Sequence, residues 1–253
     1  LKNLEMIDRK NEYIICLPSA PIEGLPKSRA HWNYKLLKPR KLWTRIALPF
    51  ALFSARSKGD LIFSPTHYIP RFSPIKRIAL IFDLAFLHFP EMFTKDELWK
   101  LRNWTKYSAQ NADHIITISN FSKKDIVEQY GLDKNKVTVA YPGYDYEKFK
   151  VQSSKLKVNK IKTKSGDGNN YIIFVGTIQP RKNLIRLIEA VSRIENLKLM
   201  VVGKTKGEGK EGWMYQDTLD SPKKFGIEDR VIFRGYLDNE KLSGLMSTAS
   251  AFI

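Results

Sequence analysis

The chain has 253 residues, of which 43% are hydrophobic and 27% charged, and its formal net charge is +17. This composition is ordinary for a globular protein, and the length allows one large domain or two smaller ones. It excludes a membrane-spanning helix, because no apolar run approaches the roughly 18 residues that such a helix needs. The excess of cations favours an anionic partner, such as nucleic acid, acidic lipid or a phosphorylated ligand, without choosing between these.

The only cysteine, Cys16, excludes an internal disulfide. It lies in the apolar run YIICL, where we expect a buried and unreactive thiol, and a lone thiol fits a reducing cytoplasm. From the first residues, LKNLEMIDRK, we expect no secretory signal peptide. They are typical of the end of a helix that leads into a strand.

Strands and helices alternate along the chain. Apolar runs predict strands in two series, first at 13–17, 60–63, 78–82, 114–118 and 137–139, then at 171–175, 198–202, 231–233 and 250–253. Residues 183–194 have the apolar spacing of an amphipathic helix, with Asn183 as its N-cap. Ser122 and Asp125 have the spacing of a capping box for a helix that runs to Tyr130 and ends at Gly131. The alternation predicts βαβ units and mainly parallel sheets.

Residues 27–58 form a basic segment with nine Lys or Arg and no acidic residue. Trp32, Trp43 and several Leu and Phe are interleaved with the charges. Such a segment can lie on an anionic membrane surface. The alternative is a helix with a solvated basic face over a buried apolar one.

A lysine-rich stretch, VQSSKLKVNKIKTKSGDGNN (151–170), separates the two strand series and reads as a solvated linker. We therefore expect an α/β domain over 1–148, a linker over 149–168 and a second α/β domain over 169–253. The run SAFI stops inside an expected strand. We expect a fragment of a longer protein, with the second domain incomplete.

The stretch VGTIQPRKN (175–183) predicts an anion site. A strand ends at Gly176, where the backbone can turn or approach a ligand closely. The following helix offers free N–H groups and the positive end of its dipole, and Arg181 and Lys182 add full charges beside it. A phosphate or diphosphate suits this arrangement. The alternative is that both cations are surface residues before an amphipathic helix.

The same stretch resembles the start of the C-terminal domain of the family 4 retaining glycosyltransferases, which have the GT-B fold. Further stretches resemble the family in the same order along nearly the whole chain, namely DLAFLHFPEMF (83–93), ADHIITISNFSKKDI (112–126), VAYPGYD (139–145), VVGKTKGEGKEGWMYQDT (201–218) and 226–253. The resemblance implies two Rossmann-like domains with parallel sheets that face a cleft. The N-terminal domain would bind the acceptor and the C-terminal domain the nucleotide-sugar donor.

The resemblance also implies roles for individual residues. Donor diphosphate binding passes to the segment that contains Gly176, Thr177, Arg181 and Lys182. The Gly-Tyr turn, Gly235 and Tyr236, would line the nucleotide pocket. The family commonly has His-Asp where this sequence has Phe82 and Asp83. Asp83 is a candidate catalytic residue, and the alternative is a strand-end carboxylate that caps a local turn.

Metal and nucleoside-triphosphate motifs are not evident. The histidines His31, His67, His88 and His114 are scattered, and Asp145 and Glu147 more closely resemble the acids of a helix start than a metal-binding pair. The tripeptide GKT (203–205) lacks the earlier glycine of a phosphate-binding loop, since that position holds Lys198. We expect neither a metal nor another cofactor.

Sugar transfer is the function that the resemblance implies, from a donor such as GDP-mannose or a UDP-sugar to a glycan or lipid-linked acceptor. We expect a cytoplasmic enzyme, with membrane contact through 27–58. The alternatives are a basic nucleic-acid-binding protein and a GT-B sugar-nucleotide epimerase. In the family, part of the donor pocket and the first strand lie beyond the ends of this sequence. We therefore expect the 253 residues alone to bind a nucleotide diphosphate and to transfer no sugar.

Overall fold

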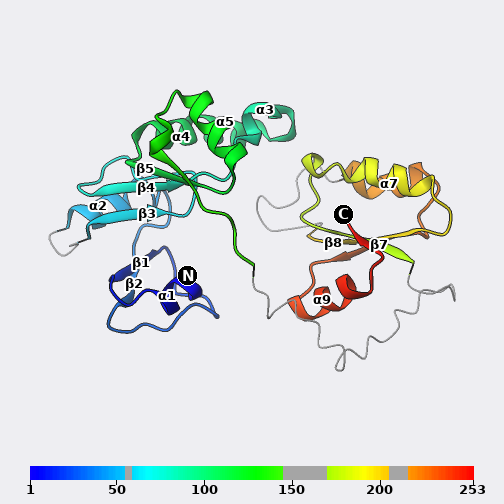
Figure 1. The fold of residues 1–253 in the computed structure, drawn as a ribbon, viewed down its shortest axis with the longest axis horizontal. Coiled ribbons are helices and arrows are strands. Elements are labelled where there is room, and N and C mark those ends of the chain that lie inside the picture. Colours follow the sequence, from blue (N-terminus) through cyan, green and yellow to red (C-terminus); the bar gives the residue numbers. More distant parts are fainter. Residues whose placement is uncertain (55–58, 145–169, 205–215) are drawn as a thin grey trace. The chain divides into compact units, whose positions relative to one another are not determined.

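The computed structural model describes residues 1–54, 59–144, 170–204 and 216–253 (Figure 1). Within it the chain divides into two compact units, Leu1–Pro142 and Gly143–Ile253, called unit 1 and unit 2 below. The predicted linker, the acids Asp145 and Glu147, and the Gly-Trp-Met-Tyr segment at 212–215 lie outside the described residues. The domain bounds expected at 148 and 169 stay predictions for the same reason.

Unit 1 contains two parallel sheets. One consists of β1 (Tyr13–Leu17) and β2 (Trp32–Leu36). The other has the order β3-β4-β5-β6, with β3 at Leu61–Ser64, β4 at Lys76–Leu80, β5 at His114–Thr117 and β6 at Val137–Val139. The helices are α1 (Lys2–Ile7), α2 (Ala47–Phe53), α3 (Ala85–His88), α4 (Lys95–Asn111) and α5 (Asn120–Tyr130), with 3-10 turns at Pro90–Met92 and Lys134–Lys136.

The core of unit 1 lies between these helices and the larger sheet. Ala79 and Ile115 from neighbouring strands pack with Phe86, Ala109 and Ile126 from the helices. A second cluster surrounds α2, where Cys16 of β1 and Ile62 of β3 both pack against its buried face. Cys16 is half-buried, less than expected, and burial raises the pKa of its thiol.

The basic segment differs from the helix that its composition suggested. Its first part forms β2, in which Trp32 is buried and Asn33 exposed, and of its described residues, 27–54, only 47–53 form an α-helix. The period-two alternation of WNYKL is the signal for this strand. Trp32 also donates its indole N–H to Tyr34 Oη at 3.1 Å, and that hydroxyl donates to Pro26 O at 2.6 Å.

The start of α5 also differs from prediction. Ser119, not Ser122, is the N-cap, and its Oγ accepts from Ser122 N at 3.0 Å. Asp125 is buried in the middle of the helix, so it is not the capping-box acid of the first turn. The predicted end is confirmed, because Gly131 has φ +62°, the left-handed conformation that glycine adopts without strain.

Unit 2 is one parallel sheet with helices on both faces. Its order is β10-β7-β8-β9, with β7 at Tyr171–Val175, β8 at Lys198–Val202, β9 at Val231–Gly235 and β10 at Ala251–Phe252. A 3-10 turn spans Pro180–Lys182, and the helices are α7 (Leu184–Ser192), α8 (Gln216–Lys224) and α9 (Asn239–Thr248). In Figure 1, α7 lies on one side of the sheet and α9 on the other.

Two separate apolar clusters explain why the strands of unit 2 are continuous apolar runs. Phe174, Leu199 and Val201 pack with Leu184 and Ile188 of α7 on one face. The alternate residues Tyr171, Ile173, Met200 and Val202 pack on the other face, against partly buried residues of α9. Both faces of the sheet are therefore covered, as in doubly wound α/β proteins.

Every strand pair in the described residues is parallel, which confirms the predicted α/β class. The nine predicted strands are all present, with shifts of a few residues at their ends. The cleft between two facing units stays a prediction. None of the helices in the described ranges combines the length and the apolar character needed to cross a bilayer.

Candidate functional site

Three adjacent strands of unit 2 end in glycine at the carboxyl edge of the sheet. Gly176 follows β7, Gly203 follows β8, and Gly235 ends β9. Gly176 N donates to Val202 O at 2.9 Å, and Gly203 N donates to Gly235 O at 2.8 Å. Glycines leave the strand ends without side chains, so a ligand can approach the backbone directly. In open parallel sheets this edge is where ligands bind.

Gly203 tolerates no side chain in this arrangement. A Cβ atom there would lie 1.9 Å from the carbonyl oxygen of Gly176. Gly235 has φ +68°, which also favours glycine. Two of the three glycines are therefore fixed by backbone geometry. The close approach brings the residue after each glycine, namely Thr177, Lys204 and Tyr236, to the same edge.

Lys204 is a member of this edge that the sequence analysis missed. Its carbonyl accepts from Ile178 N at 3.4 Å, which places it beside the segment that follows β7. Its Nζ atom lies 5.8 Å from the centre of the exposed Tyr236 ring, within reach of a cation–π contact. The repeated pattern of a strand followed by Gly-X was the available signal. The tripeptide GKT (203–205) was compared only with the phosphate-binding loop of nucleoside-triphosphate sites, so Lys204 was not predicted here.

Arg181 and Lys182 lie in the 3-10 turn between β7 and α7, and both side chains are exposed. Arg181 Nε donates to Gln179 Oε1 at 3.1 Å. Neither residue forms an ion pair with any carboxylate in the described ranges. Two full positive charges therefore stand at the carboxyl edge, where an anionic group can bind them.

The start of α7 adds backbone donors to these cations. Asn183 occupies the predicted N-cap position, but its φ is +53° and its side chain makes no capping hydrogen bond. The predicted N-cap is therefore confirmed by position, but its side chain supplies no capping hydrogen bond. Leu187 N donates to Asn183 O at 3.3 Å, as in a regular helix. The N–H groups before it have no acceptor within the helix, and the Asn183 side chain does not supply one. Such a helix start attracts anions.

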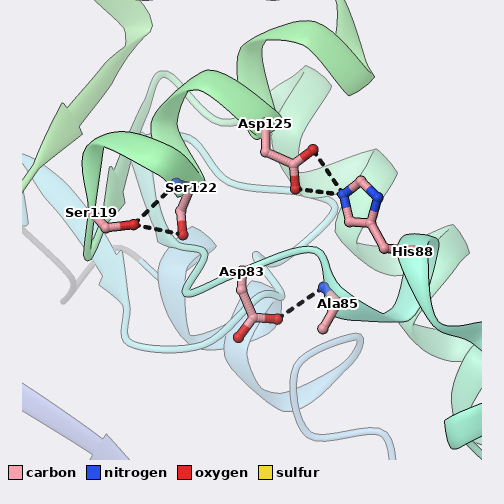
Figure 2. A network of polar contacts seen from close by, with 6 residues as sticks. All are labelled: Asp83, Ala85, His88, Ser119, Ser122 and Asp125. Atoms are coloured by element: carbon pink, nitrogen blue, oxygen red, sulfur yellow. Dashed lines mark hydrogen bonds and ion pairs between the residues drawn. The ribbon is translucent and has the colours of Figure 1, made fainter. Parts of the chain in front are cut away.

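Asp83 in unit 1 makes the local contact that was its alternative role. It follows β4, and its Oδ1 accepts from Ala85 N at 3.0 Å, where α3 begins (Figure 2). The carboxylate is exposed, and its other oxygen has no hydrogen bond within the described residues. Asp83 is thus a turn-capping residue with one oxygen still open to a ligand. Its catalytic role remains untested.

His67 was not singled out from the sequence, yet it lies beside Phe82 and Asp83. It follows β3, the neighbour of β4, and its ring centre is 6.1 Å from that of Phe82. Thr105 Oγ1 lies 3.5 Å from its Nδ1 atom. Burial lowers the pKa of His67, and Asp83 opposes the shift, so the ring is neutral near pH 7. The pairing of β3 with β4 brings it there, which spacing along the sequence does not show.

His88 and Asp125 form the polar contact between α3 and α5 (Figure 2). His88 Nε2 lies 2.9 Å from both carboxylate oxygens of the buried Asp125. This contact accounts for the buried acid inside α5. Within the described ranges, no group of three or more His, Cys, Asp or Glu side chains is arranged to hold a metal ion.

Two protein families match this chain in succession. Residues 26–148 match the family described as Glycosyltransferase Family 4, and residues 157–253 match Glycosyl transferases group 1. Similar curated proteins include O-antigen chain mannosyltransferase B of Escherichia coli, 24% identical over 87% of this chain and 55% of that protein. Mannosylfructose-phosphate synthase of Agrobacterium fabrum is 25% identical over 95% of this chain and 56% of its own length. The chain thus spans somewhat more than half the length of these relatives.

Solved structures share the fold. HepE of Anabaena in complex with UDP-glucose has a TM-score of 0.65 at 19% identity, covering 88% of this chain and 60% of HepE. Sucrose-phosphate synthase of Thermosynechococcus elongatus also has a TM-score of 0.65, at 16% identity, covering 91% of this chain and 62% of the synthase. The relatives and the two matching families cover both units.

Proposed function

Because the chain belongs to the family 4 glycosyltransferases of the GT-B fold, we propose that it is part of an enzyme that transfers a sugar from a nucleotide-sugar donor. The observation that supports this most is the carboxyl edge of unit 2. At this edge lie three strand ends that terminate in glycine, the cations Arg181 and Lys182, and the start of α7. Such a group of donors suits a diphosphate, which is the leaving group of sugar transfer.

The reaction that follows has a defined balance. The bond from the anomeric carbon of the sugar to the diphosphate breaks, and a bond from that carbon to an acceptor hydroxyl forms. Negative charge develops on the diphosphate oxygen, and the hydroxyl proton passes to a base or to that oxygen. Arg181, Lys182 and the α7 N–H groups would stabilise the developing charge. This chemistry needs neither a metal nor another cofactor.

Tyr236 is proposed to contact the nucleotide. Its ring is largely exposed at the end of β9 and has Lys204 above it. An exposed ring at this position can stack on a base, while Lys204 can reach a phosphate. The donor is proposed to be GDP-mannose or a UDP-sugar, because one relative is named a mannosyltransferase and HepE was solved with UDP-glucose. Retention of the sugar configuration and a glycan or lipid-linked acceptor are likewise proposed.

Donor binding is tested by calorimetric titration of the chain with UDP, GDP and their sugars. Replacing Arg181 and Lys182 together with alanine should weaken binding by at least about a hundredfold, since each charge-assisted contact contributes about 1.5–3 kcal/mol. The matched control is Lys223→Ala with Lys224→Ala. These two exposed cations end α8, just before β9 begins, so they lie near the opposite edge of the sheet. Equal weakening in both pairs would contradict the proposed site.

A further inference from the structure

Helix α2 is apolar on both of its faces. Its inward residues are buried in the core of unit 1, namely Ala47, Leu48, Ala51 and Leu52. Its outward side carries Ile46, Phe50 and Phe53, whose exposed fractions are 49%, 81% and 61%. They are spaced by four and three residues, so they share one helical face. Leu42 lies one turn earlier and is also exposed, and its carbonyl accepts from Ile46 N at 2.9 Å. We call these four outward residues the α2 ridge.

Cations adjoin the α2 ridge, and acids are absent from this part of the sequence. Lys38, Arg40 and Lys41 are exposed and directly precede Leu42. No acidic residue occurs between Glu23 and Asp60. Arg45, which directly precedes Ile46, is exposed as well, and its guanidinium lies 4.6 Å from the centre of the Trp104 ring.

A water-exposed row of aliphatic and aromatic side chains with adjoining cations is the pattern of an interfacial membrane contact. The apolar side chains reach the acyl boundary, and the cations remain at the level of the headgroup phosphates. Nucleic acid would use the cations and a stacking ring, but it offers nothing to Leu42 or Ile46. The cations favour an anionic partner, and the exposed apolar side chains favour a partner with an apolar interior. An anionic lipid bilayer has both properties.

We propose that the α2 ridge docks unit 1 onto an anionic lipid bilayer, with Lys38 and Lys41 against lipid phosphates. The membrane contact expected of residues 27–58 is thereby assigned to one face, the α2 ridge, and to the cations that precede it. It does not depend on the transfer reaction, since the ridge belongs to unit 1 and the proposed donor site to unit 2. A membrane-bound enzyme of this kind would meet a lipid-linked acceptor at the bilayer surface.

The test is co-sedimentation of the 253-residue chain with two kinds of vesicle. One is phosphatidylcholine alone, and the other is equal parts phosphatidylcholine and phosphatidylglycerol. Binding is expected only to the anionic vesicles. Phe50→Ser with Phe53→Ser should lower the binding constant about tenfold or more, because membrane affinity scales with buried apolar area. The control is Phe121→Ser, which removes one ring of similar exposure from α5, and Phe50→Ser alone is the single-ring variant to compare with it.

A second pair of variants separates local contact from the attraction of a chain with net charge +17. Lys38→Gln with Lys41→Gln removes two cations beside the ridge. Lys123→Gln with Lys124→Gln removes two from α5. The first pair should weaken binding severalfold more than the second. Thermal unfolding of each variant checks that the fold is retained, and the lysine pair gives a second readout if the double serine variant unfolds.

Three outcomes would overturn the proposal. One is equal binding to neutral and anionic vesicles, or no binding to either. Another is equal weakening by both lysine pairs together with no effect of the serine substitutions, which means diffuse electrostatic attraction. The third is a concentration-dependent dimer in analytical ultracentrifugation that the serine substitutions abolish, which assigns the ridge to a second copy of the chain.

Discussion

At the scale of single residues, Tyr130 shows how burial of one polar group affects stability. Its hydroxyl is buried at the end of α5 and has no hydrogen-bond partner within the described residues. Burial, with a smaller contribution from Asp125, raises the pKa of Tyr130 to about 12 from a model-compound value of 10.0. The folded state therefore holds this proton more tightly than the unfolded state.

A pH-dependent loss of stability follows. The contribution of Tyr130 is fully present below pH 10 and is lost as the pH rises towards about 12. Replacing Tyr130 with phenylalanine should leave stability at pH 7 unchanged or slightly raised, because the removed hydroxyl has no partner. It should also reduce the loss of stability between pH 10 and 12. Urea unfolding across this range measures both effects. A loss as steep in the variant as in the parent chain would contradict the assignment.

Residue positions also show what the sequence predicts and what it does not. Gly176, Arg181 and Lys182 could be found because the strand, the glycine and the cations follow one another along the chain. His67 could not be found in this way, because only the pairing of β3 with β4 brings it beside Phe82. The same holds for Asp125, whose partner His88 lies 37 residues earlier. Lys204 directly follows a strand and a glycine, so the sequence holds a signal for it, but its contact with Tyr236 appears only in the structure.

At the scale of elements, the contact between the ends of β7 and β8 is the tightest in the candidate site. Gly203→Ala would place a methyl group 1.9 Å from Gly176 O, so the strands must move apart. We expect this substitution to lower the free energy of unfolding by about 1–3 kcal/mol, the usual range for overpacking. It should weaken UDP or GDP binding as well, because the strand ends bound the proposed site.

The control is Gly176→Ala on the neighbouring strand. A Cβ atom there would lie 3.5 Å from the Phe174 ring, an ordinary van der Waals contact. Chemical denaturation of both variants compares them directly. If both substitutions lower the free energy of unfolding by the same amount, the close backbone approach at Gly203 does not explain its effect, and the prediction is wrong.

Elements differ in how far local sequence determines them. The strands of unit 2 were predictable because both faces are buried and each strand is a continuous apolar run. Strand β2 was missed because the nine cations of residues 27–58 indicated a membrane-facing or helical segment, whereas the alternation that predicts a strand spans only the five residues WNYKL. The start of α5 was misplaced by three residues because two serines, Ser119 and Ser122, both suit the N-cap position, and the structure uses Ser119.

At the scale of the whole molecule, each unit has its own core. Leu199 and Ile115 are both fully buried, one in unit 2 and one in unit 1. Leu199→Ala should destabilise unit 2 by about 2–5 kcal/mol through the cavity that it leaves, and Ile115→Ala should do the same to unit 1. Hydrogen exchange read peptide by peptide shows which unit loses protection. Equal loss in both units from either substitution would contradict separate cores.

The two sheets of unit 1 have a further consequence. Within the described residues, β1 pairs only with β2, and β3 pairs only with β4, although Cys16 and Ile62 pack against the same cluster. Among the described residues, each of these strands therefore has one edge without a strand partner, where an extended chain could pair. Ile14, Leu61 and Phe63 are about half exposed there. The isolated chain is thus a template for strand addition, and self-association through these edges should limit the concentration at which it stays dispersed.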